Sequence, residues 1–186
     1  FISFESMVKL RDTFTLAMEA QTRKLAGQMT DGQIDLQRWV TETRTTVKVA
    51  FTDQYLLGRG GRKMMNSSDW GKVGAMLREQ YQFLNRFAED VAAGKLSAAQ
   101  IAQRATMYAD ASTQAYERGK AAAWGIALPA YPADGSTRCL TNCRCSWRIE
   151  ADETEVRAYW SLGIAEHCED CLERAETWAP LTYPRR

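Results

Sequence analysis

The residues best suited to chemistry in this sequence are five cysteines and a single histidine near the C-terminal end. The stretch RCLTNCRCSW holds three of the thiols, and EHCEDC holds the other two beside the histidine. The cysteines are Cys139, Cys143, Cys145, Cys168 and Cys171. Thiols at this density indicate either a zinc site or a set of disulfides. Because five is odd, they cannot all pair as disulfides within one chain.

The spacing favours a structural zinc ion. Cys168-x2-Cys171 falls at a predicted helix start, where two thiolates can bind one metal and the helix dipole stabilises them. Cys139 with either Cys143 or Cys145 would complete four ligands. This order of loop ligands, two short strands and helix ligands is typical of a treble-clef-like zinc module. We therefore predict one Zn²⁺ per chain, with His167 beside the site rather than bound to the metal.

A catalytic zinc is not predicted. Four thiolates fill a tetrahedral shell and leave no open position for a reacting water. The stretch HCEDC contains the His-x-Glu of zinc deaminases, but no Pro-Cys-x-x-Cys follows it. The single histidine lies inside the cysteine cluster, so a Ser-His-Asp triad has no support either. We expect a protein that is not an enzyme.

Composition limits the partners. The 186 residues carry 24 basic and 23 acidic side chains, so the overall charge favours neither nucleic acid nor an anionic membrane. No apolar run reaches the roughly 18 residues that span a bilayer. The chain opens with FISFESMVKL, without an initiator Met, a basic leader or a cleavage site, so we expect a trimmed or processed chain. Without a secretory signal, clustered thiols favour metal over disulfides.

The elements that position the cysteines follow from helical periodicity and proline placement. No proline occurs before residue 129, and we predict helices from Phe1 to about Trp124. One begins at Thr30 or Asp31 and ends at the glycines after Leu57. The next runs from a cap at Ser68 to Gly94. A further helix starts at Ser97, which has capping-box spacing to Gln100, and small residues on its inner face predict close helix packing. That face comprises Ile101, Ala105, Tyr108, Ser112, Ala115 and Gly119.

The C-terminal third is expected to fold differently. Strands are predicted at 148–150 and 156–160, followed by a short helix that ends before Pro180. Trp147, Trp160 and Trp178 are expected to form the small core of this module. We thus predict a helical body over residues 1–127 and a linker with a cysteine-rich module over 128–186. The fold class is mainly α, with a small C-terminal α+β zinc-binding module that resembles a treble clef.

A basic, glycine-rich stretch, GRGGRK at residues 58–63, lies between two predicted helices. It lacks the Gly-x4-Gly-Lys-Ser/Thr pattern of a phosphate-binding P-loop. Two interpretations stay open: a plain connector, or a contact with DNA phosphates through Arg59, Arg62 and Lys63.

One stretch also resembles a known family. Asn142, Cys143, Arg144 and Cys145, preceded by the helical segment from Gly94, resemble the Asn-Cys-Arg-Cys signature of the phage head morphogenesis family, the Mu F-like minor capsid proteins. The His-Pro that often precedes the signature is replaced here by Leu140-Thr141. The later Cys-x-x-Cys is similar to that of a subset of tailed-phage and prophage members. The resemblance covers roughly residues 94–180.

This resemblance implies a structural role in the virion. The expected protein is a minor head component, associated with portal or major capsid subunits, present in several copies in the phage head and in the host cytoplasm during assembly. It implies head morphogenesis without any catalytic residue, and it makes non-specific DNA contact an additional expectation. The alternative is a zinc-containing nucleic-acid-binding protein.

Overall fold

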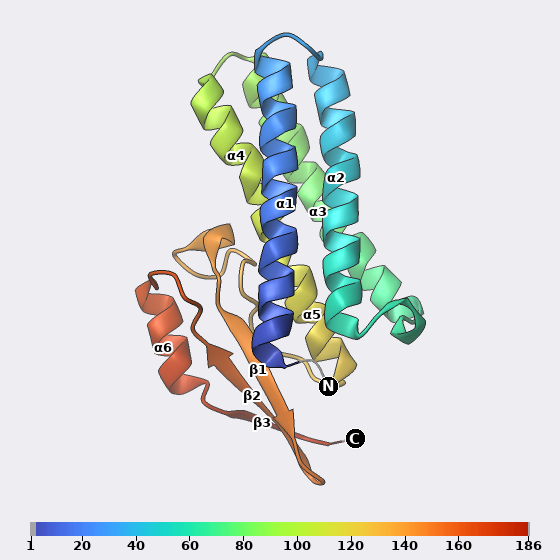
Figure 1. The fold of residues 1–186 in the computed structure, drawn as a ribbon, viewed down its shortest axis with the longest axis vertical. Helices are drawn as coiled ribbons and strands as arrows, with labels where there is room; N and C mark the ends of the chain where they lie inside the picture. The colour runs from blue at the N-terminus through green and yellow to red at the C-terminus, as the bar shows by residue number, and fades with distance from the viewer. Residues whose placement is uncertain (1–2, 186) are drawn as a thin grey trace.

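Five helices form an elongated bundle that stands on a small sheet in the computed structural model, which describes residues 3–185 (Figure 1). They are α1 (Phe4–Thr30), α2 (Leu36–Arg59), α3 (Ser67–Ala92), α4 (Ala98–Ala111) and α5 (Thr113–Ala123). A single 3₁₀ turn, η1 (Arg62–Met64), joins α2 to α3. The helical body is thus confirmed over the described residues, while Phe1 and Ile2 of the predicted range lie outside them.

Capping residues set the helix boundaries. The predicted capping box is confirmed, because the Ser97 side chain accepts from the Gln100 N–H while the Gln100 side chain accepts from the Ser97 N–H. The predicted start at Thr30 or Asp31 is wrong, since these residues close α1 and Asp35 caps α2 instead. The cap predicted at Ser68 is also displaced. Asn66 and Asp69 form a capping box there, and it starts α3 two residues earlier.

The helix predicted from Ser97 onward is broken at Ser112 into α4 and α5. The Ser112 hydroxyl donates to the Ala109 carbonyl at 2.6 Å, an arrangement that competes with continued helical hydrogen bonding. Its predicted inner face is nevertheless buried from Ile101 to Gly119. A Cβ on Gly119 would lie 2.3 Å from the Tyr55 carbonyl oxygen. The predicted close approach therefore exists, and α2 is the helix that α5 meets.

The core of the bundle is apolar and centres on α2, α3 and α4. Trp39 packs edge-on against Phe87 with ring centroids 5.1 Å apart, and Phe87 stacks on Tyr108 at 6.1 Å. Leu84 and Phe51 are fully buried beside them. Long side chains thus connect α3 to α4, whereas the backbone of α4 runs closest to α1.

The C-terminal module is an antiparallel sheet with one helix. Its elements are η2 (Leu140–Asn142), β1 (Ser146–Ala151), β2 (Glu155–Ser161), α6 (Glu169–Thr177) and β3 (Leu181–Pro184). The sheet order is β1-β2-β3, so β2 is central. The two predicted strands and the final helix are confirmed, and β3 was not predicted. The mainly helical class with a small C-terminal α+β module is therefore confirmed.

Three tryptophans form the core of this module, as predicted. Trp147 and Trp178 stack with centroids 5.6 Å apart, and Trp160 packs edge-on against both at 5.3 and 5.7 Å. The buried side chains of Val156, Ala158 and Trp160 alternate along β2 and face this cluster. The cysteine-bearing segments pack on the same core.

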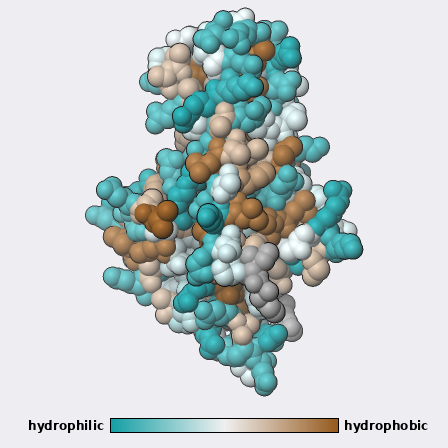
Figure 2. Space-filling view, in the orientation of Figure 1, coloured by the Kyte–Doolittle hydropathy of each residue, from teal (hydrophilic) through white to brown (hydrophobic). Residues whose placement is uncertain are grey.

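The surface is mostly polar. In the orientation of Figure 1, hydrophilic side chains cover the two ends of the molecule and apolar ones gather around mid-height (Figure 2). Within residues 3–185, no helix is long and apolar enough to cross a membrane.

Candidate metal centre

Three thiols meet where η2 faces the start of α6. The Sγ atoms of Cys139, Cys143 and Cys171 all lie within 4.8 Å of one another. Cys171 Sγ is 3.7 Å from both Cys139 Sγ and Cys143 Sγ. In a tetrahedron with Zn–S bonds of about 2.3 Å, neighbouring sulfurs are about 3.8 Å apart. The three thiols are therefore spaced as ligands of one metal ion.

Cys168 lies next to this group, at the N-cap of α6. Its Sγ is 3.6 Å from Cys139 Sγ, which makes it the nearest candidate for a fourth ligand. Contacts across the site hold the helix start in place. The Arg138 N–H donates to Asp170 Oδ2 at 2.6 Å, and the Arg138 guanidinium pairs with Glu169. The first turn of α6 is thereby fixed against the loop that carries Cys139.

The fifth thiol, Cys145, borders the cluster and is hydrogen-bonded to the Cys143 thiol. Its Sγ lies 4.0 Å from His167 Nδ1 and is buried. The Cys143 backbone is extended, and the chain enters β1 at Ser146, just after Cys145. Of the five predicted cysteines, the structure brings three together and places Cys168 and Cys145 beside them, with Cys145 between Cys143 and His167.

The electrostatics of the cluster suit a cation. Burial raises the pKa of the Cys139 thiol to about 11 and also raises the pKa of Cys171. A hydrogen bond from Cys145 lowers the pKa of the Cys143 thiol to about 5, which favours its thiolate form. Several buried thiolates would repel one another without a counter-charge. A divalent cation supplies that charge and favours deprotonation of every thiol that binds it.

Arg144 joins the cysteine loop to the helical body. Its Nη2 donates to Glu19 Oε1 on α1 at 2.6 Å and to Asp110 Oδ1 on α4 at 2.7 Å. Burial and the neighbouring Glu19 raise the pKa of Asp110 to about 7. A Cβ on Gly163 would lie 2.4 Å from the Arg144 carbonyl oxygen, so only glycine fits there. The residue between Cys143 and Cys145 is thus anchored from three sides.

A second set of contacts, fully buried, lies just below. Arg11 on α1 and Glu117 on α5 are both 0% exposed and form an ion pair of 2.9 Å. Arg11 Nη1 also donates to the Cys145 carbonyl at 2.9 Å, and Glu117 accepts from the Trp147 N–H at 3.0 Å. Lys120 Nζ completes the set at 2.9 Å from Glu117 Oε2. We call Arg11, Glu117, Lys120 and Arg144, with Glu19 and Asp110, the polar seam.

The sequence did not predict the polar seam. Arg11 and Glu117 are charged residues on predicted helices, each next to another charged residue, and such residues are usually solvated. The signal that was present is the burial of their neighbours, since Ala115 and Gly119 flank Glu117 on the predicted inner face. A charged residue on an inner face indicates a buried partner, but it does not identify that partner.

The basic stretch at residues 58–63 differs from the predicted loop. Gly58 lies within α2 and packs against the Tyr116 carbonyl. Arg59 Nε is 3.1 Å from the buried Asp69 Oδ2, and its side chain is only 13% exposed. Arg62 lies over the Trp70 ring at 5.6 Å, and Lys63 is exposed in η1. Arg59 therefore stabilises the α2–α3 connection, and contact with DNA stays a prediction for Arg62 and Lys63.

No family model, no curated protein and no solved structure matches this chain.

Proposed function

We propose that this chain is a structural head component of a tailed phage or prophage, in which one zinc ion holds the C-terminal module together. The ligands are Cys139, Cys143, Cys168 and Cys171. The observation that carries the proposal is the use of the Asn-Cys-Arg-Cys stretch: Cys143 lies in the thiol cluster and Arg144 binds the body. Every contact of this stretch described above is architectural.

The donor set supports zinc. Thiolates are soft ligands, and four of them in a tetrahedron favour Zn²⁺ over the oxygen-binding cations. A shell of four cysteine thiolates also leaves no open coordination position, which is why we assign the metal a structural role and no reaction. The sulfur spacing of 3.6–3.7 Å needs little adjustment to accept the ion.

The proposed setting is the phage head, next to portal or major capsid subunits. Two features support an assembly role. One is the resemblance of residues 142–145 to head morphogenesis proteins, and the other is that this stretch joins two regions of the fold instead of lining an open cleft. A rigid subunit keeps the entropy cost of joining a large assembly small.

Metal content tests the site. We expect purified protein in reducing buffer to hold one zinc per chain by elemental analysis. Cys143→Ser should lose the metal, while the matched Cys145→Ser should keep it, because only the Cys143 thiol lies in the cluster. Metal-free wild-type protein whose thiols pair on oxidation would refute the zinc site.

Particle composition tests the setting. Mass spectrometry of purified heads and proheads from the encoding phage or induced prophage should detect several copies of this chain. Absence from both kinds of particle would refute the head role, whatever the metal content.

A further inference from the structure

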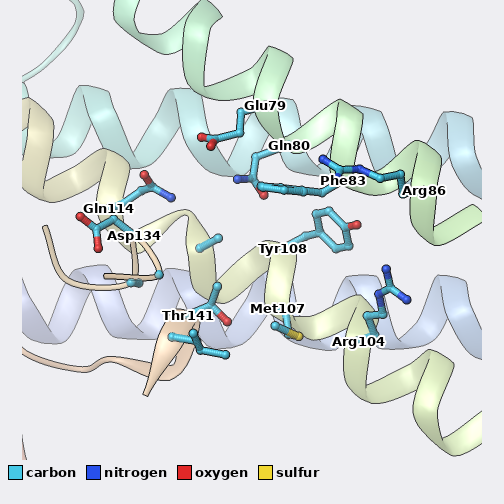
Figure 3. A pocket seen from close by; sticks show the side chains of 14 residues that line it. Glu79, Gln80, Phe83, Arg86, Arg104, Met107, Tyr108, Gln114, Asp134 and Thr141 are labelled. Atoms are coloured by element: carbon cyan, nitrogen blue, oxygen red, sulfur yellow. The ribbon is translucent and has the colours of Figure 1, made fainter. Parts of the chain in front are cut away.

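A pocket of about 360 Å³ opens between α3, α4, α5 and the loop around η2. This volume falls within the range of specific ligand sites, about 300–1,000 Å³. Figure 3 shows its arrangement, with the guanidinium groups of Arg86 and Arg104 at one end and the carboxylates of Glu79 and Asp134 toward the other. Phe83, Met107 and Tyr108 lie between these ends. None of these residues belongs to the thiol cluster or the polar seam.

Two amides that line this pocket form no hydrogen bond with the protein. Gln80 and Gln114 are each only 5% exposed, and neither side chain forms a hydrogen bond within residues 3–185. In Figure 3 the two amides extend from α3 and α5 toward one another. Neither amide is among the enclosed polar atoms without a partner, so both keep access to the pocket, whereas Thr141 Oγ1 in the same lining is enclosed and unpaired. A ligand with peptide groups can therefore hydrogen-bond with the two amides in place of water.

Some of the charged side chains at the two ends of the pocket are already paired within the protein, and others are not. Arg104 Nη1 pairs with Asp90 at 2.9 Å, and Asp134 accepts from the Tyr131 and Ser136 N–H groups. Arg86 and Glu79, by contrast, have no ion-pair partner in the described part of the chain. They lie seven residues apart on α3, on one face and about 10 Å apart along the axis. An extended peptide covers about this distance in three residues.

We infer that this pocket binds an extended peptide segment of a partner protein, with an acidic side chain at Arg86, a basic side chain at Glu79 and an apolar side chain between them. The apolar side chain packs on Phe83, which is 42% exposed in the free chain. The Gln80 and Gln114 amides, each both donor and acceptor, bind peptide groups of the segment. Charge complementarity favours a peptide over nucleic acid, because Glu79 would repel phosphates.

The test uses the metal-loaded protein and two capped tetrapeptides. One begins with glutamate and ends with lysine, with leucine and alanine between them, and the other has the charges in reverse order. We expect one of them to bind below about 1 mM by fluorescence polarisation. Arg86→Glu, at an exposed position, should weaken that peptide about tenfold or more. A peptide with lysine at both ends should restore binding to Arg86→Glu.

The amides are tested by Gln114→Leu, with Gln103→Leu on the exposed side of α4 as the matched control. Gln114→Leu should weaken binding about tenfold, and Gln103→Leu should leave it unchanged. The inference is overturned if neither peptide binds, or if Arg86→Glu and Gln114→Leu bind as well as wild type. It is also overturned if ultracentrifugation shows a dimer that Arg86→Glu dissociates while no peptide binds, since the occupant is then a second copy.

Discussion

The helical body and the cysteine module bury their cores in different ways. The body packs aromatic and aliphatic side chains from five helices, and Trp39, Phe51 and Leu84 are completely enclosed. The module has three strands, one short helix and a core of three tryptophans bordered by thiols. A region this small rarely buries enough apolar surface to fold without a cross-link or a metal. One chain can therefore stabilise one part by the size of its core and the other, as we propose, by coordination of zinc.

The contact between the two regions follows neither scheme. Arg11, Glu117 and Lys120 form a buried polar layer there, bonded to the backbone at Cys145 and Trp147. Such contacts are directional, so they fix one orientation of the module on the body more strictly than apolar packing does. Apolar packing, metal coordination and buried polar contacts can be disrupted one at a time, which shows how far they act independently.

Metal removal should have the largest effect. Structural zinc contributes apparent binding energies of about 10–16 kcal/mol in small modules, so a strong chelator should unfold the C-terminal module. We expect loss of the near-ultraviolet circular dichroism of the stacked Trp147 and Trp178, with most far-ultraviolet helical signal retained. Cys145→Ser, which keeps the metal, is the control. An unchanged tryptophan signal would show that the module folds without metal.

Breaking the buried ion pair should come next. Arg11→Met leaves Glu117 without its closest guanidinium and should cost about 3–5 kcal/mol in the free energy of unfolding, measured with urea. Combining it with Glu117→Leu should cost less than the sum of the single changes, because neither member of the pair is then left without the other. Arg23→Met, at an exposed position of α1, should change stability by less than about 0.5 kcal/mol. Equal effects at Arg11 and Arg23 would contradict the buried pair.

A cavity in the core of the helical body should lower the free energy of unfolding by a similar or smaller amount than loss of the ion pair. Its effect should stay within the helical body. Leu84→Ala removes a completely buried side chain and should cost about 2–5 kcal/mol. We expect zinc content to stay at the wild-type value in this variant. Leu16→Ala, at a position 59% exposed, serves as the control and should cost far less. Loss of zinc in Leu84→Ala would show that the two regions are not separable.

The smallest effect is a pH dependence from Asp110. Its folded pKa of about 7 lies above that of an unfolded aspartate, near 4, because burial disfavours the charge. The folded state then holds a proton that the unfolded state releases, so this residue's contribution to stability falls as pH rises from about 4 to about 7. Asp110→Asn removes this component. The difference between the urea midpoints of wild type and Asp110→Asn should therefore change between about pH 4 and pH 7. A difference that stays constant over this pH range would contradict the raised pKa.

Local patterns predicted much of the fold and of the site. The Cys-x2-Cys pair indicated a helix start because its spacing is a property of one turn, and α6 does begin there. The strand β3 could not be predicted, because it contains Pro184, which disfavours a strand except at an edge, and it forms only by pairing with β2. The choice between Cys143 and Cys145 also depended on tertiary contacts. Only the position of α6 relative to η2 decides which thiol meets Cys171.

Besides the adjacent Asp12, Arg11 has partners far along the chain, 106 residues away at Glu117 and 134 residues away at Cys145. At translation rates of about 5–20 residues per second, α1 leaves the ribosome roughly ten seconds before the Cys145 carbonyl exists. Until then the Arg11 guanidinium needs water, so the lower half of α1 cannot close completely onto the bundle. A contact of the first helix synthesised therefore waits for a segment that follows all five helices of the body. Synthesis as far as Cys145, rather than completion of these helices, sets the earliest time at which the bundle closes.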